Sequence, residues 1–230
     1  MCVDTFNACI ARGRRYEGSQ FNRARHLAQC AKHLEQIRAE LGNHWPALNN
    51  DSQEFPNKPE TKKLVKHLIR TCSESVDFYA TVDFMTTGVC TILQKSAGAK
   101  GGAKKAHLRQ WSTMSHEHMV PGEVILKELL QPNADIQYIL NALSFRALVT
   151  GPMRTGLDNE VTLLDQNHRT SLPSCVNFNS RGELRTSEIN MVFYPMLRYE
   201  VTGLVDQLIP LNERAETLLS EYNNFKKLNV

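Results

Sequence analysis

Apolar residues recur at alternating spacings of three and four between residues 20 and 42, and no other feature of the chain constrains its fold as strongly. The stripe consists of Leu27, Cys30, Leu34, Ile37 and Leu41. These positions share one side of a helix, so the sequence predicts an amphipathic helix that must bury this side against another element. The repeat also suits a homodimer or a helical protein partner.

Similar signals continue along the chain and predict further helices. Pro59 and Pro121 each stand where a helix is expected to begin, because the fixed φ of proline suits the first helical turn. Another helix is expected to be capped near Asn133 or Asp135, because short polar side chains accept hydrogen bonds from free N–H groups. A last helix is expected to begin at Pro210.

Strand signals are weaker and fall mainly in the second half. The short apolar runs at residues 146–150 and 191–194 are the candidate strands. For residues 75–93 both helix and strand remain open, since this stretch is rich in Val, Thr and Phe. We therefore expect a mainly α protein with a small α+β portion and a bundle-like N-terminal half.

Residues 95–109 form a distinct segment with three Gly, five Lys or Arg and no acid. The absence of Asp and Glu extends from Phe84 to His116. This composition divides the chain into a helical region (1–94), a flexible basic loop (95–109) and an α+β region (110–230). The same segments are also compatible with one single domain.

The basic loop predicts contact with a nucleic-acid phosphate backbone, since Lys and Arg neutralise phosphates as point charges. The candidate residues are Lys100, Lys104, Lys105 and Arg109. A solvated linker without a ligand is the alternative interpretation of the same composition.

The overall composition excludes several classes of protein. With 230 residues, 41% of them hydrophobic and 22% charged, the chain is globular rather than disordered. No apolar stretch approaches the roughly 20 residues that span a bilayer, and the first residues lack an apolar leader, so we expect a cytoplasmic protein without membrane contact. The six Cys form no CxxC pair, which argues against a zinc finger.

The densest cluster of ligand-type side chains is His116-Glu117-His118. Two imidazoles and a carboxylate in three residues suit a divalent cation, or a general base beside a metal ligand. In an extended segment His116 and His118 would share a face, although His116 also fits a plain surface residue. Because the basic loop comes just before this cluster, a phosphodiester is the natural substrate for such chemistry.

The run Glu117-His118-Met119-Val120-Pro121 resembles the first motif of HNH, or His-Me finger, nucleases. The resemblance implies that Glu117 is a metal ligand, that His118 is the base that activates water, and that the metal is Mg²⁺ or Mn²⁺. It also implies a short β-hairpin followed by a helix. The further ligands that it requires are sought among Asp158, Asn159 and His168, with Asn141 as another candidate.

Two other interpretations compete with this one. Ser115 and Glu117 precede Pro121 and would suit a structural cap for the free N–H groups of the following helix. Arg109 and His116 are separated by six residues and resemble the catalytic pair of all-α HEPN ribonucleases.

Taken together, the residues and the resemblance predict a metal-dependent endonuclease that acts on nucleic acid, with double-stranded DNA as the expected substrate. The resemblance places such enzymes in restriction, toxin or antiviral defence systems. A non-catalytic helical protein that binds nucleic acid or another protein is the alternative from a different class.

Overall fold

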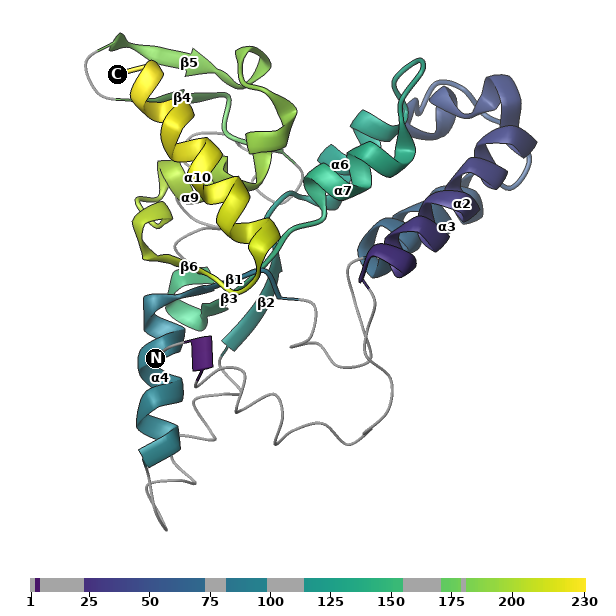
Figure 1. Cartoon of the computed structure of the whole chain (residues 1–230). Helices are drawn as coiled ribbons and strands as arrows, with labels where there is room; N and C mark the ends of the chain where they lie inside the picture. The colour runs from purple at the N-terminus through teal and green to yellow at the C-terminus, as the bar shows by residue number, and fades with distance from the viewer. Residues whose placement is uncertain (1–2, 5–22, 73–81, 99–113, 155–170, 179–180) are drawn as a thin grey trace.

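The computed structural model describes residues 3–4, 23–72, 82–98, 114–154, 171–178 and 181–230. Helices predominate and one small sheet lies at the centre, so the expected class, mainly α with a small β portion, is confirmed (Figure 1). The α-helices are α2 (Arg23–Leu41), α3 (Lys58–Thr71), α4 (Thr87–Gly98), α6 (Gly122–Leu129), α7 (Ile136–Leu143), α9 (Tyr194–Val201) and α10 (Glu213–Leu228).

Short 3-10 helices connect several of these elements. They are η1 (Gly42–His44), η2 (Pro46–Asn49), η5 (Thr186–Glu188), η6 (Met191–Phe193) and η7 (Val205–Gln207).

Four strands form a mixed sheet in the order β2 (Met114–His118), β3 (Arg146–Thr150), β1 (Phe84–Thr86) and β6 (Leu208–Pro210). The central strands β1 and β3 are parallel, while β2 and β6 are antiparallel to their neighbours. A separate hairpin pairs β4 (Cys175–Asn177) with β5 (Glu183–Arg185). The sheet therefore joins segments that lie far apart in the sequence.

The two faces of the central sheet bury different side chains, because successive residues of a strand point to opposite sides. Phe84 and Ala147 pack on one face against α9 and α10. Met85 and Leu148 pack on the other face against α4. The central strands β1 and β3 are thus covered on both sides, which explains why residues 146–150 form an apolar run in the sequence.

The helices α2, α3, α6 and α7 form a bundle around their own core, which we call the helical lobe. The predicted stripe of α2 lies in this core: Leu27, Cys30 and Leu34 are buried, and Ile37 and Leu41 pack at its edge. The bundle-like packing that we expected of the N-terminal half is therefore present. Half of it, however, comes from the middle of the chain.

The helix ends agree largely with the sequence signals. Asp135 caps α7, because its carboxylate accepts a hydrogen bond of 2.8 Å from the backbone N of Tyr138. Pro59 lies in the first turn of α3, as predicted. The last helix begins at Glu213 instead of Pro210, because Asn212 supplies the cap and Pro210 belongs to β6.

The expected strand at residues 191–194 is wrong, whereas the one at 146–150 is confirmed as β3. Residues 191–193 form η6, whose start is capped by the Asn190 side chain, and Pro195 stands in the first turn of α9. An Asn cap followed closely by a Pro favours a helical start over a strand. The apolar run reflects burial, not extended backbone.

The region 1–94 is not purely helical, because β1 lies within it and is a central strand of the sheet. For the described part of residues 75–93, both open possibilities occur in succession: β1 is followed directly by α4. The proposed boundary between a helical and an α+β region therefore does not separate the sheet from the N-terminal part of the chain.

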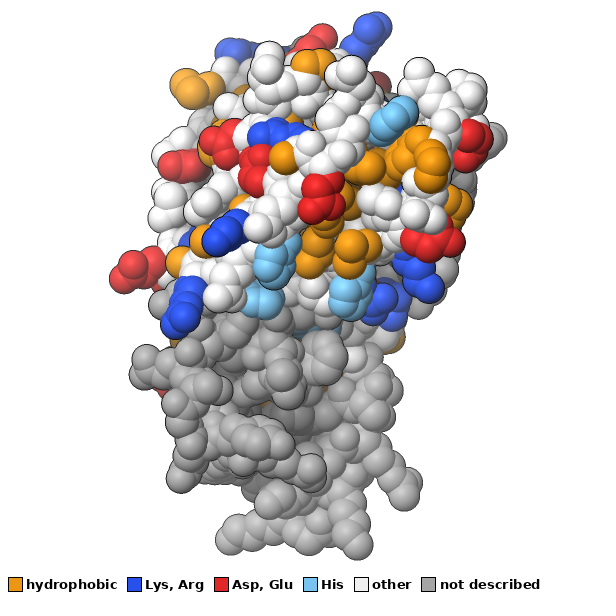
Figure 2. All heavy atoms as spheres, turned by 90° about the vertical axis from the view of Figure 1, so that its right-hand side faces the viewer, with side chains coloured by type: hydrophobic (Ala, Val, Ile, Leu, Met, Phe, Trp, Pro, Cys, Tyr) orange, Lys and Arg blue, Asp and Glu red, His pale blue; other side chains and the backbone are white. Residues whose placement is uncertain are grey.

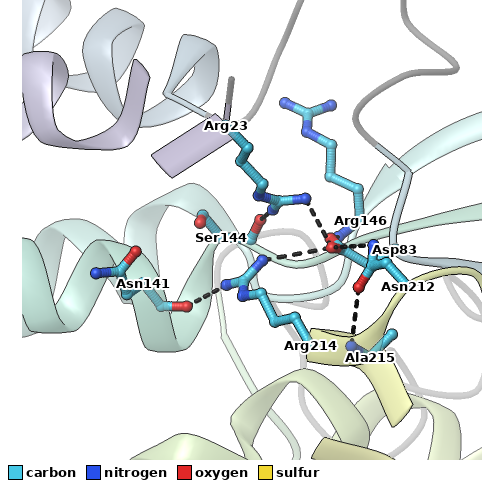
Figure 3. Close-up of polar contacts among 8 residues, drawn as sticks. All are labelled: Arg23, Asp83, Asn141, Ser144, Arg146, Asn212, Arg214 and Ala215. Carbon is cyan, nitrogen blue, oxygen red and sulfur yellow. Dashed lines mark hydrogen bonds and ion pairs between the residues drawn. The ribbon is translucent and has the colours of Figure 1, made fainter. Parts of the chain in front are cut away.

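A buried carboxylate, that of Asp83, joins four of these segments (Figure 3). Its oxygens accept hydrogen bonds from Arg23 at 2.7 Å, Asn212 at 3.2 Å and the backbone N of Arg146 at 2.9 Å. Arg214 forms an ion pair with it at 3.4 Å and lies over the ring of Phe145. A fully buried charge is tolerated only when it is paired in this way.

The two arginines also tie this cluster to the end of α7. Arg23 donates to the carbonyl of Ser144, and Arg214 donates to the carbonyl of Asn141. The last carbonyls of a helix have no partner within the helix, so these contacts satisfy groups that would otherwise be unpaired. Asp83 thereby fixes the point where α7 leads into β3.

We predict that Asp83→Asn lowers the free energy of unfolding by about 3 kcal/mol or more, because it leaves two guanidinium groups without their buried anion. Urea denaturation followed by circular dichroism measures the change. Asp206→Asn, which alters an exposed carboxylate, serves as the matched control. A difference of less than about 0.5 kcal/mol between the two variants would contradict a central role for Asp83.

Candidate functional site

Strand β2 places the three residues of the predicted motif on two different faces of the sheet. Its register pairs His116 with Leu148 and His118 with Arg146, whereas Glu117 lies opposite Ala147. Alternate residues share a face, so the two imidazoles point one way and the carboxylate points the other. The shared face of the two histidines is as expected from the sequence.

Both imidazoles contact the guanidinium group of Arg146. Nη1 of Arg146 lies 2.9 Å from Nδ1 of His116, and Nη2 contacts Nε2 of His118. The Arg146 side chain is buried, with 1% exposed, and it points away from Asp83, which binds only its backbone (Figure 3). One residue of β3 thus connects the Asp83 cluster with the histidine pair.

This environment keeps both histidines neutral. Burial, and secondarily the charge of Arg146, lowers the pKa of His116 from 6.5 to about 3. The same two causes lower the pKa of His118 to about 3. A general base works best when its pKa lies near the operating pH, so His118 is a weak base in this arrangement.

His118 and Arg146 also contact the end of α3. Nη2 of Arg146 donates to the carbonyl of Arg70 at 2.7 Å, and Nε2 of His118 lies 3.3 Å from the same oxygen. Nε2 of His26, on α2, lies 2.9 Å from the carbonyl of Thr71. Helix ends expose free carbonyls, and here side chains from α2, β2 and β3 surround them.

Glu117 belongs to a different set of contacts. Its carboxylate accepts a hydrogen bond of 3.1 Å from Ser115 and pairs with Nε of Arg154 at 2.7 Å. Burial raises the pKa of the Tyr199 phenol above its usual range, Arg198 opposes this shift, and Glu117 adds to it. The carboxylate therefore faces the side of the sheet that carries α9.

The capping interpretation of this motif is wrong. Ser115 and Glu117 lie within β2, and the residue at the N-cap position of α6 is Pro121, with no side-chain cap. After β2 the chain forms α6 and α7 before it reaches the antiparallel partner β3. The described residues around the motif thus do not follow the hairpin-then-helix order that the HNH resemblance implies.

Most of the other predicted site residues lie outside the described residues. They are Lys100, Lys104, Lys105, Arg109, Asp158, Asn159 and His168. Asn141 is described but exposed on α7, where its carbonyl contacts Arg214. Within the described ranges, no three His, Cys, Asp or Glu side chains gather closely enough to hold a metal ion. The described contacts therefore do not assemble the ligand set that Mg²⁺ or Mn²⁺ would need.

A basic surface lies where α2 begins and α3 ends. The contact between His26 and Thr71 brings these two helix ends together. Residues 23–34 and 61–72 contain seven Lys or Arg and no acid. Figure 2 shows histidine and Lys or Arg side chains along the lower edge of the described part of this face. The signal was present as two acid-free helix segments, but only contact between them makes one surface.

Comparison of the chain with family models, with curated proteins and with solved structures gave no match. Among the described helices, none has the length and apolar character needed to cross a membrane. The site must therefore be interpreted from its own geometry.

We predict that the protein loses stability as the pH falls from about 6.5 to 3. In this range the unfolded imidazoles of His116 and His118 take up protons near their ordinary pKa, whereas the folded ones, with pKa values of about 3, do not. The unfolded state then binds more protons, so stability rises with pH, by at most about 1.4 kcal/mol per pH unit for each imidazole.

Urea midpoints at several pH values measure this dependence. For the double variant His116→Gln/His118→Gln, the urea midpoint should depend less steeply on pH between about 4 and 6 than it does for the unchanged protein. An equally steep profile in the variant would mean that these imidazoles titrate normally in the folded protein.

Proposed function

We propose that the chain binds the phosphate backbone of nucleic acid through the surface formed by the start of α2 and the end of α3. We call it the α2–α3 surface and define it by Arg25, Lys63, His67 and Arg70, which are all exposed. The observation that carries the proposal is the contact between two acid-free, cation-rich helix segments at one end of the helical lobe. Clustered Lys and Arg on one face are the electrostatic signature of nucleic-acid binding.

The Arg side chains at the start of α2 lie where a positive charge does not stabilise the helix, which favours a role in ligand binding. Arg23 and Arg25 occupy the first turn of α2, which contains no acid. The partial positive charge at a helix N-terminus favours anions, so cations there oppose helix formation. Arg23 forms an ion pair with Asp83, and Arg25 adds an exposed positive charge at the same end of the helix.

On α3 two exposed cations, Lys63 and Arg70, and the imidazole of His67 between them form a row that leads toward β2. Lys63, His67 and Arg70 follow one another at spacings of four and three, so they share one side of the helix. Arg70 lies at the end of this row, where its carbonyl is held by Arg146. A row of this kind neutralises successive phosphates without reading their bases.

The same geometry supports binding without cleavage better than it supports hydrolysis. In the predicted metal-dependent endonuclease Glu117 would hold the ion and His118 would activate a water molecule beside it, whereas β2 directs the two side chains to opposite faces. The Arg146 contact further weakens His118 as a base. Cleavage of DNA with Mg²⁺ or Mn²⁺, as in an antiviral nuclease, stays a prediction of the motif resemblance, and the HEPN-type pairing of Arg109 with His116 has the same status.

We predict that Arg25→Ala/Lys63→Ala weakens binding to duplex DNA and reduces its salt dependence. Each lost phosphate contact lowers the slope of log K against log salt by about 0.9, so the double variant should lose up to about 1.8. Fluorescence anisotropy with a labelled duplex across a salt series measures the slope. Its matched control is Arg185→Ala/Lys227→Ala, which removes two exposed cations near the C-terminal lobe of β4, β5, α9 and α10. Equal slopes in the two variants would show that the α2–α3 surface does not contact the DNA phosphates.

A plasmid-nicking assay separates binding from hydrolysis. We expect supercoiled DNA to remain intact with Mg²⁺ or Mn²⁺, because the described Glu117 and His118 side chains do not face one site. His118→Ala and Glu117→Gln, compared with and without EDTA, test the assignment. EDTA-sensitive nicking that His118→Ala abolishes, with DNA binding retained, would overturn the non-catalytic proposal in favour of the nuclease.

A further inference from the structure

A cleft of about 530 Å³ lies between the helical lobe and the C-terminal lobe, and none of the four residues that define the α2–α3 surface lines it. One wall is α6, with Glu123, Lys127 and Glu128. The opposite wall comes from the segments that flank the β4–β5 hairpin. Ligand sites in proteins commonly occupy clefts of this size where two lobes meet.

The floor of the cleft is the junction between the two main cores. Val124 and Tyr194 both line the cleft, and both pack against the core of the helical lobe and against the core of the sheet with α9 and α10. A ligand in the cleft would therefore contact both cores at once.

The wall opposite α6 is rich in uncharged hydroxyl groups. Ser171, Ser174, Thr186 and Ser187 line it, and of these the Thr186 hydroxyl already donates to the carbonyl of Pro173. Hydroxyl groups both donate and accept hydrogen bonds, so this wall suits a ligand that does the same. A strongly charged ligand would gain little from it.

The α6 wall supplies acceptors without net positive charge. Glu123 pairs with Lys66 across the lobe, while Lys127 and Glu128 carry opposite charges side by side. Burial, and secondarily the Glu128 carboxylate, raises the pKa of the Tyr194 phenol, which therefore stays a hydrogen-bond donor. The Glu128 carboxylate can accept hydrogen bonds from hydroxyl groups of a ligand, and the ring of Tyr194 can pack against the face of a ligand ring. The same carboxylate disfavours a phosphate group.

We propose that this cleft binds a neutral, sugar-bearing small molecule, with Glu128 accepting hydrogen bonds from its hydroxyl groups and Tyr194 packing against its ring. The shared chemistry is a ring with neighbouring hydroxyl groups, which a ribonucleoside or a free saccharide provides. This site goes beyond the nucleic-acid surface and does not depend on it.

The test is a titration of the ¹⁵N-labelled full chain with adenosine, with 2′-deoxyadenosine and with maltose, followed by amide chemical shifts. We expect saturable shifts in α6 and around Thr186 and Ser187 with adenosine or with maltose, and the probe that binds identifies the source. If adenosine is that probe, 2′-deoxyadenosine should bind about tenfold more weakly, because a lost hydroxyl leaves an unpaired polar group in the site.

Variants decide whether the cleft is the site. Glu128→Gln should weaken binding of the active probe about tenfold while the protein remains folded, and Glu216→Gln, on the exposed side of α10, should not. Ser187→Ala provides a second, milder variant on the other wall. The proposal would be overturned if none of the three probes gave saturable shifts, or if the shifts were unaffected by Glu128→Gln and Ser187→Ala. Neither result bears on DNA binding by the α2–α3 surface, which is measured separately.

Discussion

The buried charge of Asp83 is the constraint on which the rest of the structure depends. Arg23 comes from α2, Arg146 from β3, and Asn212 and Arg214 from the start of α10, and all of them contact this one carboxylate. Burying a charge is costly unless its partners are held in place, so the three segments must meet at Asp83 for the chain to fold. Long-range order in this protein therefore rests on one short side chain that directly precedes β1.

The constraint extends from Asp83 to the surface through Arg146. Its backbone binds Asp83, while its guanidinium reaches the two histidines of β2 and the carbonyl of Arg70 near the end of α3. The start of α2 is held at the same place by Arg23 and His26. The clustering of cations at that end of the helical lobe is thus a consequence of the same polar network that orders the sheet.

The sequence predicted local structure better than it predicted the site. The α2 stripe, the Asp135 cap and β3 were foreseen because short-range periodicity and capping determine them. The run at 191–194 was misassigned because burial on two sides resembles a strand pattern. The partners of Asp83 could not be predicted, because they come from segments 60 residues or more away. The opposite facing of Glu117 and His118, in contrast, follows from the alternation of side chains once residues 114–118 are known to form a strand.

The helical lobe has a further consequence for how the chain can be divided. Its core combines α2 and α3 with α6 and α7, although β1 and α4 come between them in the sequence. A fragment that ends after α3 would deprive Leu27 and Leu34 of the α6 and α7 side of their core, and one that ends before α10 would lack Arg214. The basic surface is accordingly not a transplantable module: grafted alone onto another scaffold, its helices would lose the architecture that aligns them.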